Sequence, residues 1–180
     1  MSIVHEMSTN HASAAATIAE NARELRKAAD QMVRDARRAD EKMGRTYDPK
    51  SYITVDRIVT RMADQTDACF VYCGCRLLYG KDINRCKNKD AATLERIDSN
   101  VAHVADNCIL ACMSCNRSKG YNIPFDVMKQ WAVPIKRGVA KWCNSCQTVK
   151  CVAQFGRDRS TRDKLDYRCK GCNTIHCVQT

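Results

Sequence analysis

The longest pattern of apolar positions in the chain runs from residue 11 to residue 43. Small and apolar residues recur there at alternating steps of four and three, a heptad spacing that forms one face of a helix: Ile18, Ala22, Leu25, Ala29, Met32, Ala36, Ala39 and Met43. The run contains neither Pro nor Gly, and Gly44 offers a C-terminal stop. We therefore expect a long N-terminal helix whose thin, alanine-rich face packs on its own protein, on a second copy or on a partner protein.

A second, shorter helical pattern follows a linker that contains Pro49. Apolar residues stand there at positions i, i+3, i+4 and i+7, which lie on one face of a helix: Val55, Ile58, Val59 and Met62. Thr54 directly precedes them and suits the N-cap. This apolar face can cover a small domain. C-terminal to this helix, the feature that repeats along the chain is the paired cysteine.

The composition leaves little for a conventional hydrophobic core. Aromatic residues make up 6 % of the 180 residues and charged residues 28 %, whereas there are 13 cysteines. The start of the chain is polar and alanine-rich, and no stretch approaches the length of a membrane span, so we expect neither a secretory signal nor a membrane contact. The sequence thus predicts a reducing, intracellular compartment, the cytoplasm or nucleus of a cell or infected host, where clustered cysteines bind zinc.

The clearest metal pattern lies near the C-terminus. Two Cys-x-x-Cys pairs, Cys143 with Cys146 and Cys169 with Cys172, are separated by a loop of polar and turn-forming residues. Each pair can span one edge of a tetrahedron, and four thiolates leave no open position on the metal. We expect a structural Zn²⁺ at these four residues, with Cys151 as a thiol outside the site.

A second structural zinc site is less regular. Cys112 and Cys115 form a Cys-x-x-Cys pair, and the other two ligands come from a cluster of cysteines upstream. Zinc pairs tolerate two to four intervening residues, which favours Cys69 together with Cys73. Cys75 is the alternative ligand that would replace one of these two.

Three segments around these cysteines carry a family resemblance. They are residues 94–98 (LERID), 106–112 (DNCILAC) and 115–120 (CNRSKG). Together they resemble the HNH endonuclease family of phages and large DNA viruses, over roughly residues 53–120. The family implies a compact ββα-metal module, in which a hairpin and a helix hold one divalent cation, Mg²⁺ or Mn²⁺, over a scissile phosphate.

The resemblance also implies roles for single residues. Glu95 matches the acidic metal ligand, Asn107 the residue that orients the hairpin, and Asn116 the metal ligand on the helix. Asp98 is a further candidate oxygen ligand. Arg96 departs from the family, which places its general-base histidine at that position, because a guanidinium does not accept a proton from water.

Three alternatives follow from this departure. His103, in the loop between the two halves of the motif, has a suitable unperturbed pKa and could act as the base. Otherwise the metal alone activates the water, at a reduced rate. The third alternative is a degenerate module that binds without cutting.

The charge of the chain points to nucleic acid as the partner. A net charge of +10 attracts polyanions, and among these only nucleic acid also explains paired zinc knuckles. The unit from Lys141 to Cys172 is similar to the zinc ribbon of phage recombination endonucleases, with Phe155 as its core residue. The residues predicted to contact DNA are basic and lie in this ribbon or beside the HNH-like motif: Arg157, Arg159, Arg162, Lys164, Arg168, Arg117 and Lys119.

The sequence therefore predicts a small α+β protein in three parts: a helical segment over residues 1–44, a zinc-stapled HNH-like ββα-metal module over 45–130 and a basic zinc ribbon over 131–180. The first hypothesis for its function is a metal-dependent endonuclease that hydrolyses phosphodiester bonds in double-stranded DNA, with two structural Zn²⁺ and one catalytic divalent cation. The alternative is a catalytically degenerate zinc protein that binds DNA or serves assembly, including that of a virion.

Overall fold

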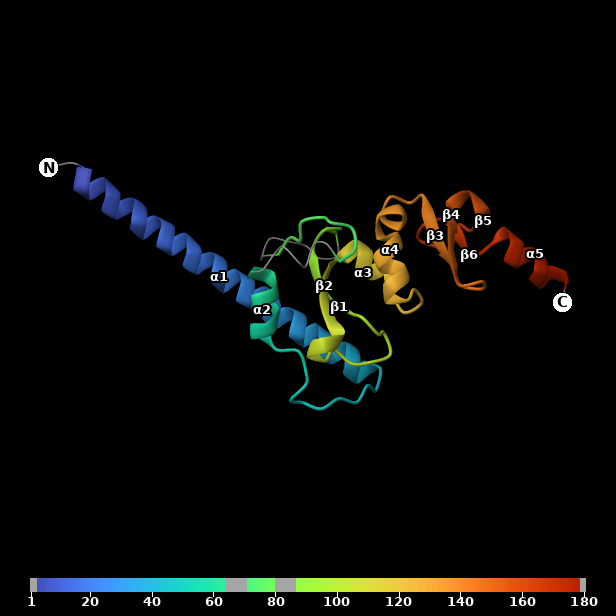
Figure 1. The fold of residues 1–180 in the computed structure, drawn as a ribbon, viewed down its shortest axis with the longest axis horizontal. Helices are drawn as coiled ribbons and strands as arrows, with labels where there is room; N and C mark the ends of the chain where they lie inside the picture. The colour runs from blue at the N-terminus through green and yellow to red at the C-terminus, as the bar shows by residue number, and fades with distance from the viewer. Residues whose placement is uncertain (1–2, 64–70, 80–86, 179–180) are drawn as a thin grey trace. The chain divides into compact units, whose positions relative to one another are not determined.

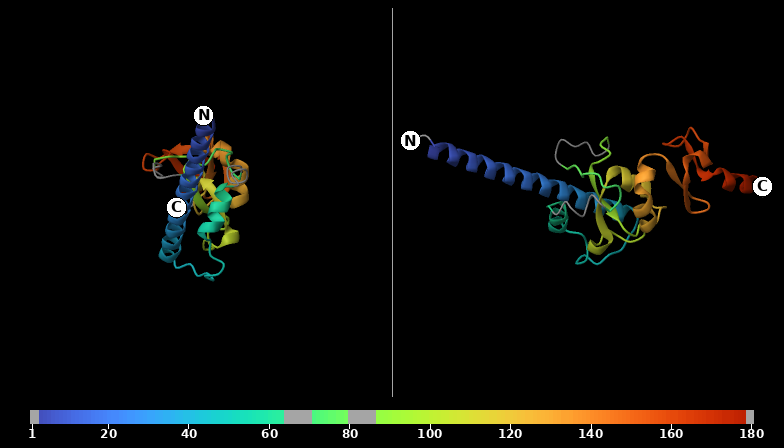
Figure 2. Two further views of the ribbon diagram at one scale, coloured as in Figure 1. Left: turned by 90° about the vertical axis from the view of Figure 1, so that its left-hand side faces the viewer. Right: turned by 45° about the horizontal axis from the view of Figure 1, so that its top comes forward.

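A computed structural model describes residues 3–63, 71–79 and 87–178 (Figures 1 and 2). The described chain is a small α+β protein with a long N-terminal helix and three two-stranded sheets. Its elements, in chain order, are α1 (Ile3–Lys42), α2 (Val55–Ala63), β1 (Ala92–Arg96), η1 (Ala105–Asn107), β2 (Cys108–Cys112), α3 (Met113–Lys119), α4 (Phe125–Lys136), β3 (Ala140–Cys143), β4 (Thr148–Cys151), η2 (Val152–Gln154), β5 (Phe155–Arg157), β6 (Leu165–Cys169) and α5 (Lys170–Val178). Among these helices none is long and apolar enough to cross a membrane.

The chain divides into two compact units, which are described in turn. The N-terminal unit comprises Met1–Cys69 and Cys75–Met113, and the C-terminal unit comprises Phe70–Gly74 and Ser114–Thr180. The first unit thus contains α1, α2 and the β1–β2 hairpin, and the second contains α4, the two other hairpins and α5.

The apolar face of α1 is buried where the helix passes α2 and the β1–β2 hairpin (Figure 1). Ala29, Met32 and Ala36 of the heptad face are 0 %, 3 % and 4 % exposed, and Ile58 and Met62 on the apolar face of α2 are buried as well. Burial of these two faces against each other removes apolar surface from water, which stabilises the pair of helices. This part of α1 therefore packs on its own protein, one of the three arrangements that the heptad pattern left open.

Asn107 closes the loop that joins β1 to β2. The two strands pair antiparallel over their whole length. The side-chain Nδ2 of Asn107 donates to the carbonyl oxygens of Asp98 and Ala102 at 3.0 and 3.1 Å, and its Oδ1 accepts from the Asp98 N–H at 2.8 Å. One amide group thus satisfies backbone groups at both ends of the loop.

Asp40, near the end of α1, is a fully buried carboxylate. Its Oδ2 accepts hydrogen bonds from the hydroxyl of Tyr52 and from the backbone N–H and ring Nδ1 of His103, each at 2.9 Å. The guanidinium groups of Arg45 and Arg96 lie 3.5 and 3.8 Å from its Oδ1. These partners compensate the cost of burying the charge. They also join α1 to the rest of the N-terminal unit, although the sequence suggested residues 1–44 as a segment apart.

The C-terminal unit has a small core between its two hairpins. β3 pairs with β4 and β5 with β6, both antiparallel. Cys143, Phe155 and Cys169 form a buried cluster, against which Leu165 and Cys172 pack. Phe155 is 4 % exposed, as expected of the core residue of a ribbon. Because this cluster contains a single aromatic ring, its apolar burial alone contributes little to holding the two hairpins together.

Replacing Asp40 by Ala should lower the free energy of unfolding by about 3 kcal/mol or more, because it leaves buried guanidinium groups and the Tyr52 hydroxyl without their acceptor. Asp56 is the matched control, since its carboxylate pairs with Arg26 at the surface, where the two side chains are 77 % and 63 % exposed. Asp56→Ala should cost less than about 1 kcal/mol. Urea unfolding followed by circular dichroism compares the two variants, and equal midpoints would contradict the role given to Asp40.

Candidate metal centre

The C-terminal unit brings four cysteines together from its hairpins and α5. Cys143 ends β3, Cys169 ends β6, and Cys172 lies in the first turn of α5. Cys146 lies in the turn between β3 and β4, where the N–H of Gln147 donates to the carbonyl oxygen of Cys143 at 2.9 Å. All four sulfur atoms lie within 4.8 Å of one another, and the four residues are those that the Cys-x-x-Cys spacing predicts.

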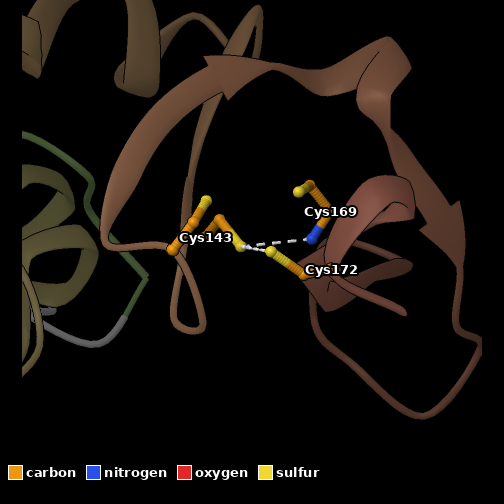
Figure 3. Close-up of side chains that lie close together, drawn as sticks. Cys143, Cys169 and Cys172 are labelled. Atoms are coloured by element: carbon orange, nitrogen blue, oxygen red, sulfur yellow. Dashed lines mark hydrogen bonds between the residues drawn. The ribbon is translucent and has the colours of Figure 1, made fainter. Parts of the chain in front are cut away.

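The distances between these sulfur atoms suit a tetrahedral metal centre. Zn–S bonds of about 2.3 Å in a regular tetrahedron place two sulfurs about 3.8 Å apart. The Sγ atoms of Cys143 and Cys172 are 3.9 Å apart, whereas a disulfide needs about 2.05 Å. The Sγ of Cys143 also accepts a hydrogen bond from the backbone N–H of Cys169 at 3.2 Å, as Figure 3 shows.

The ionisation of the four cysteine thiols favours binding of a cation. Burial opposes ionisation of Cys143, but the backbone N–H groups of Cys146, Cys169 and Ser145 donate to its sulfur and lower the pKa of Cys143 to about 6. At Cys172 the hydroxyl of Ser145 lowers the pKa, while hydrogen bonds with the other cysteines and burial raise it to about 11. Four adjacent thiols therefore do not all ionise by themselves, and a divalent metal ion supplies the charge that stabilises four thiolates.

Zn²⁺ fits this all-sulfur donor set. Thiolates are soft ligands that select zinc over Mg²⁺ or Ca²⁺, which take oxygen ligands. Four protein sulfurs fill a tetrahedral coordination sphere and leave no position for water or substrate. The geometry is therefore that of a structural metal centre, in agreement with the closed site expected from the sequence.

A second group of cysteines could hold another metal ion. The Sγ atoms of Cys73, Cys75 and Cys112 lie within 4.8 Å of one another. Cys75, the alternative ligand in the sequence, belongs to this group. Cys115 is fully buried in α3 and is not one of the three. Cys69, the remaining predicted ligand, lies outside the described residues.

Gly74 explains how a pair with one intervening residue can share a metal. In extended backbone the Cα atoms on either side of one residue lie about 6.6 Å apart, and a turn at the middle residue brings them closer together. Gly74 has φ 68°, a left-handed conformation that glycine adopts without a Cβ clash. The chain turns at this residue. The expectation that zinc-binding cysteines are separated by two to four residues does not take such a turn into account.

The residues that the HNH resemblance singles out lie on the β1–β2 hairpin and after it. Glu95 on β1 is 4 % exposed, and Asp98 is exposed just beyond the end of that strand. Asn116 belongs to α3, which follows β2 directly in the chain. The chain order is therefore strand, strand, helix. Because successive residues of a strand point to opposite faces, the side chains of Glu95 and Arg96 diverge.

His103 lies with Arg96 against Asp40. Its ring is buried, and its Nδ1 is 2.9 Å from the Oδ2 of Asp40. Burial lowers the pKa of His103 even though the Asp40 carboxylate raises it, so the imidazole is neutral near pH 7 and its Nδ1–H donates to Asp40. Arg96 reaches the same carboxylate. The ring, which the sequence placed in the loop between the two halves of the motif, is thus on the face of β1 that Glu95 does not use.

The β5–β6 hairpin presents most of the basic residues predicted to bind DNA. Arg157, Arg159 and Arg162 are exposed, and within the described residues their guanidinium groups form no hydrogen bond or ion pair. Lys164 is exposed as well, but its Nζ donates to the carbonyl oxygen of Arg159 at 2.8 Å. Arg168 is half-buried on β6.

The two basic residues of α3 differ from each other. Arg117 is exposed, whereas Lys119 is 1 % exposed. A phosphate contact, which the sequence suggested for both, does not fit the buried position of Lys119. Its ammonium group lies in the interior of the protein.

No protein-family model, curated protein or solved structure matches this chain. The class of protein therefore rests on its own geometry, which is that of a small α+β protein with two groups of cysteines that could each hold a metal ion.

Cys143→Ser should remove one equivalent of zinc per chain and unfold the C-terminal unit, because the metal-binding free energy of such a site, on the order of 10 kcal/mol, is also folding free energy. Cys151→Ser is the matched control, since Cys151 is exposed on β4 and belongs to neither group. Metal analysis and limited proteolysis of both variants give the readout. Equal zinc content in the two would contradict the assignment.

Proposed function

We propose that this chain is a zinc-stabilised protein that binds double-stranded DNA, and that its HNH-like hairpin and helix serve binding rather than cleavage. One observation carries the proposal. The segment 157–164, called here the arginine loop, presents Arg157, Arg159 and Arg162 to solvent without partners in the described part of the chain. Guanidinium groups in this state pair readily with phosphate and release its counterions.

Hydrogen bonds hold the arginine loop in one conformation. The carboxylate of Asp158 accepts from the N–H and the hydroxyl of Ser160 at 2.8 and 2.7 Å. The buried hydroxyl of Thr161 lies 3.0 and 2.9 Å from the carbonyl oxygens of Asp158 and Leu165. The N–H of Asp158 donates to the carbonyl oxygen of Lys164 at 3.0 Å. A loop fixed in this way loses little conformational entropy when it binds a ligand.

Asp163 within the arginine loop and Asp166 just after it are satisfied within their own unit. Asp163 pairs with the Nζ of Lys141 at 2.6 Å, and Lys141 is 15 % exposed. Asp166 accepts from the Nδ2 of Asn173 at 2.6 Å. Because these carboxylates are held by neighbours while the three arginines face solvent, the local potential of the loop is positive and attracts polyanions.

The N-terminal unit supports an HNH-like module without a general base. Asn107 closes the hairpin loop, which is the role that the family resemblance implies for it. Arg96 stands at the base position and remains protonated. His103, the other candidate base, donates to Asp40 on the face opposite to Glu95. This arrangement favours binding over cleavage.

A second function, metal-dependent endonuclease, is favoured by Glu95. This carboxylate is 4 % exposed on β1, and buried carboxylates are commonly paired or bound to a metal. Hard cations such as Mg²⁺ take carboxylate oxygens, which Glu95 and Asp98 of the N-terminal unit would supply. Such a cation lowers the pKa of its bound water, so that chemistry without a protein base becomes accessible.

Replacing Arg157, Arg159 and Arg162 together by Ala should weaken binding to duplex DNA about equally for all sequences. It should also flatten the slope of log K against log salt concentration by about 0.9 for each lost phosphate contact. Fluorescence anisotropy across a salt series gives both quantities. The matched control replaces three surface arginines that pair with carboxylates and removes the same charge: Arg23, Arg26 and Arg34. The same loss in both triple variants would mean that net charge alone, and not the arginine loop, binds DNA.

A plasmid nicking assay separates the two functions. The binding account predicts no Mg²⁺- or Mn²⁺-dependent nicking by the parent protein at concentrations that saturate DNA, because Arg96 and His103, the two candidates for the base position, are held against Asp40. Nicking that Glu95→Gln abolishes, while DNA affinity is unchanged, would establish the endonuclease instead. Asp106→Asn is the control for charge loss, since the side chain of Asp106 is 99 % exposed.

A further inference from the structure

The C-terminal unit contains a hollow of about 860 Å³ beside its four-cysteine centre. The turn after β3, the strand β6 and the helix α5 line it, and Cys172 contributes to its wall. Ligand pockets typically measure about 300–1,000 Å³, so a nucleotide fits this volume. Because the metal centre fixes the ends of β3 and β6, two of the walls are rigid.

Tyr167 is the aromatic side chain of this hollow, and it is 59 % exposed. Its carbonyl oxygen accepts from the N–H of Asn144 at 3.1 Å, which holds this part of β6 in place. The Nζ of Lys141 lies 5.6 Å from the centre of its ring, and Asp163 anchors that ammonium group at 2.6 Å. The ring is thus positioned on a rigid frame beside a cation, with most of its surface open to a stacking partner.

Hydrogen-bonding groups also line the hollow. The Nδ2 of Asn173 donates to Asp166 at 2.6 Å, which fixes the amide and leaves its Oδ1 as an acceptor. Amide and carboxylate oxygens accept from the exocyclic amino groups of nucleobases. Arg168 also lines the hollow and supplies positive charge next to these acceptors.

We propose that this hollow binds an unpaired base of single-stranded DNA, which stacks on Tyr167 while adjacent phosphates are drawn to the arginine loop. The proposal rests on the DNA-binding function and narrows its substrate to DNA with an unpaired segment. A base within a duplex is stacked on its neighbours and must leave the helix to reach the ring. Stacking accepts every base, so the site selects strand state and not sequence.

A short thymidine oligomer with one central 2-aminopurine tests this proposal, because stacking on an aromatic ring quenches the emission of 2-aminopurine. The parent protein should quench it. Tyr167→Ala should weaken binding of the oligomer on the order of tenfold and remove the quenching, whereas Tyr167→Phe should retain both. Tyr121→Ala is the matched control, since Tyr121 is 63 % exposed and does not line the hollow. Zinc content shows whether each variant keeps its fold.

The outcomes separate this proposal from the one on which it rests. If the Tyr167→Ala variant retains its zinc and binds and quenches the oligomer as the parent does, the hollow is not a base site. In that case, binding of the parent to duplex DNA would still support the proposed DNA-binding function. If the parent binds neither the oligomer nor the duplex, both proposals are wrong. The expected result for Tyr167→Ala is weaker oligomer binding without quenching, together with unchanged affinity for duplex DNA.

Discussion

Attraction between four cysteine sulfurs and a metal ion is the interaction on which, we infer, the C-terminal unit depends. Its buried cluster consists of Cys143, Phe155 and Cys169, and full burial of one such side chain contributes about 1.5–3 kcal/mol. A structural zinc ion contributes roughly 10–16 kcal/mol. We therefore infer that the metal, and not apolar burial, holds the two hairpins together. The strands β3 and β6, which border the arginine loop or the hollow, end at the metal-binding residues Cys143 and Cys169. The positions of the loop and the hollow therefore depend on the metal centre.

The N-terminal unit is organised by a different interaction, the buried carboxylate of Asp40. Apolar packing brings α1 against α2. The hydrogen bonds of Asp40 then fix the position of α1 relative to Tyr52 and to the loop between β1 and β2. This arrangement has a functional consequence. Arg96 and His103, the two residues that the HNH resemblance raises in connection with a general base, both contact this structural carboxylate. Under the function proposed above, the contacts that stabilise the unit also keep these two side chains from acting as a base.

The sequence predicted those features that depend on local spacing. The heptad face located Ala29, Met32 and Ala36, and the Cys-x-x-Cys pairs located the four-cysteine centre, because helix period and ligand spacing are encoded within a few residues. The contact of Asp40 with His103 joins positions 63 residues apart and follows no periodic pattern. The sequence therefore gave no reason to place that histidine in the interior.

At two further places the structure differs from the sequence-based prediction because of a backbone angle or of tertiary packing. The φ of 68° at Gly74 lets a cysteine pair with one intervening residue converge, and spacing rules do not contain backbone angles. Lys119 is buried although its residue type and its neighbours predict a surface cation, which only packing around α3 decides. Basic residues can contact a polyanion only where the structure leaves them at the surface, as it does for Arg157, Arg159 and Arg162.

X-ray absorption at the zinc edge, on full-length protein purified without chelator, tests the central claim most directly. Our account predicts bound zinc with a first coordination shell dominated by sulfur at about 2.3 Å, because cysteine thiolates supply the ligands. Protein that folds without zinc, or zinc surrounded by oxygen and nitrogen at about 2.0–2.1 Å, would contradict it.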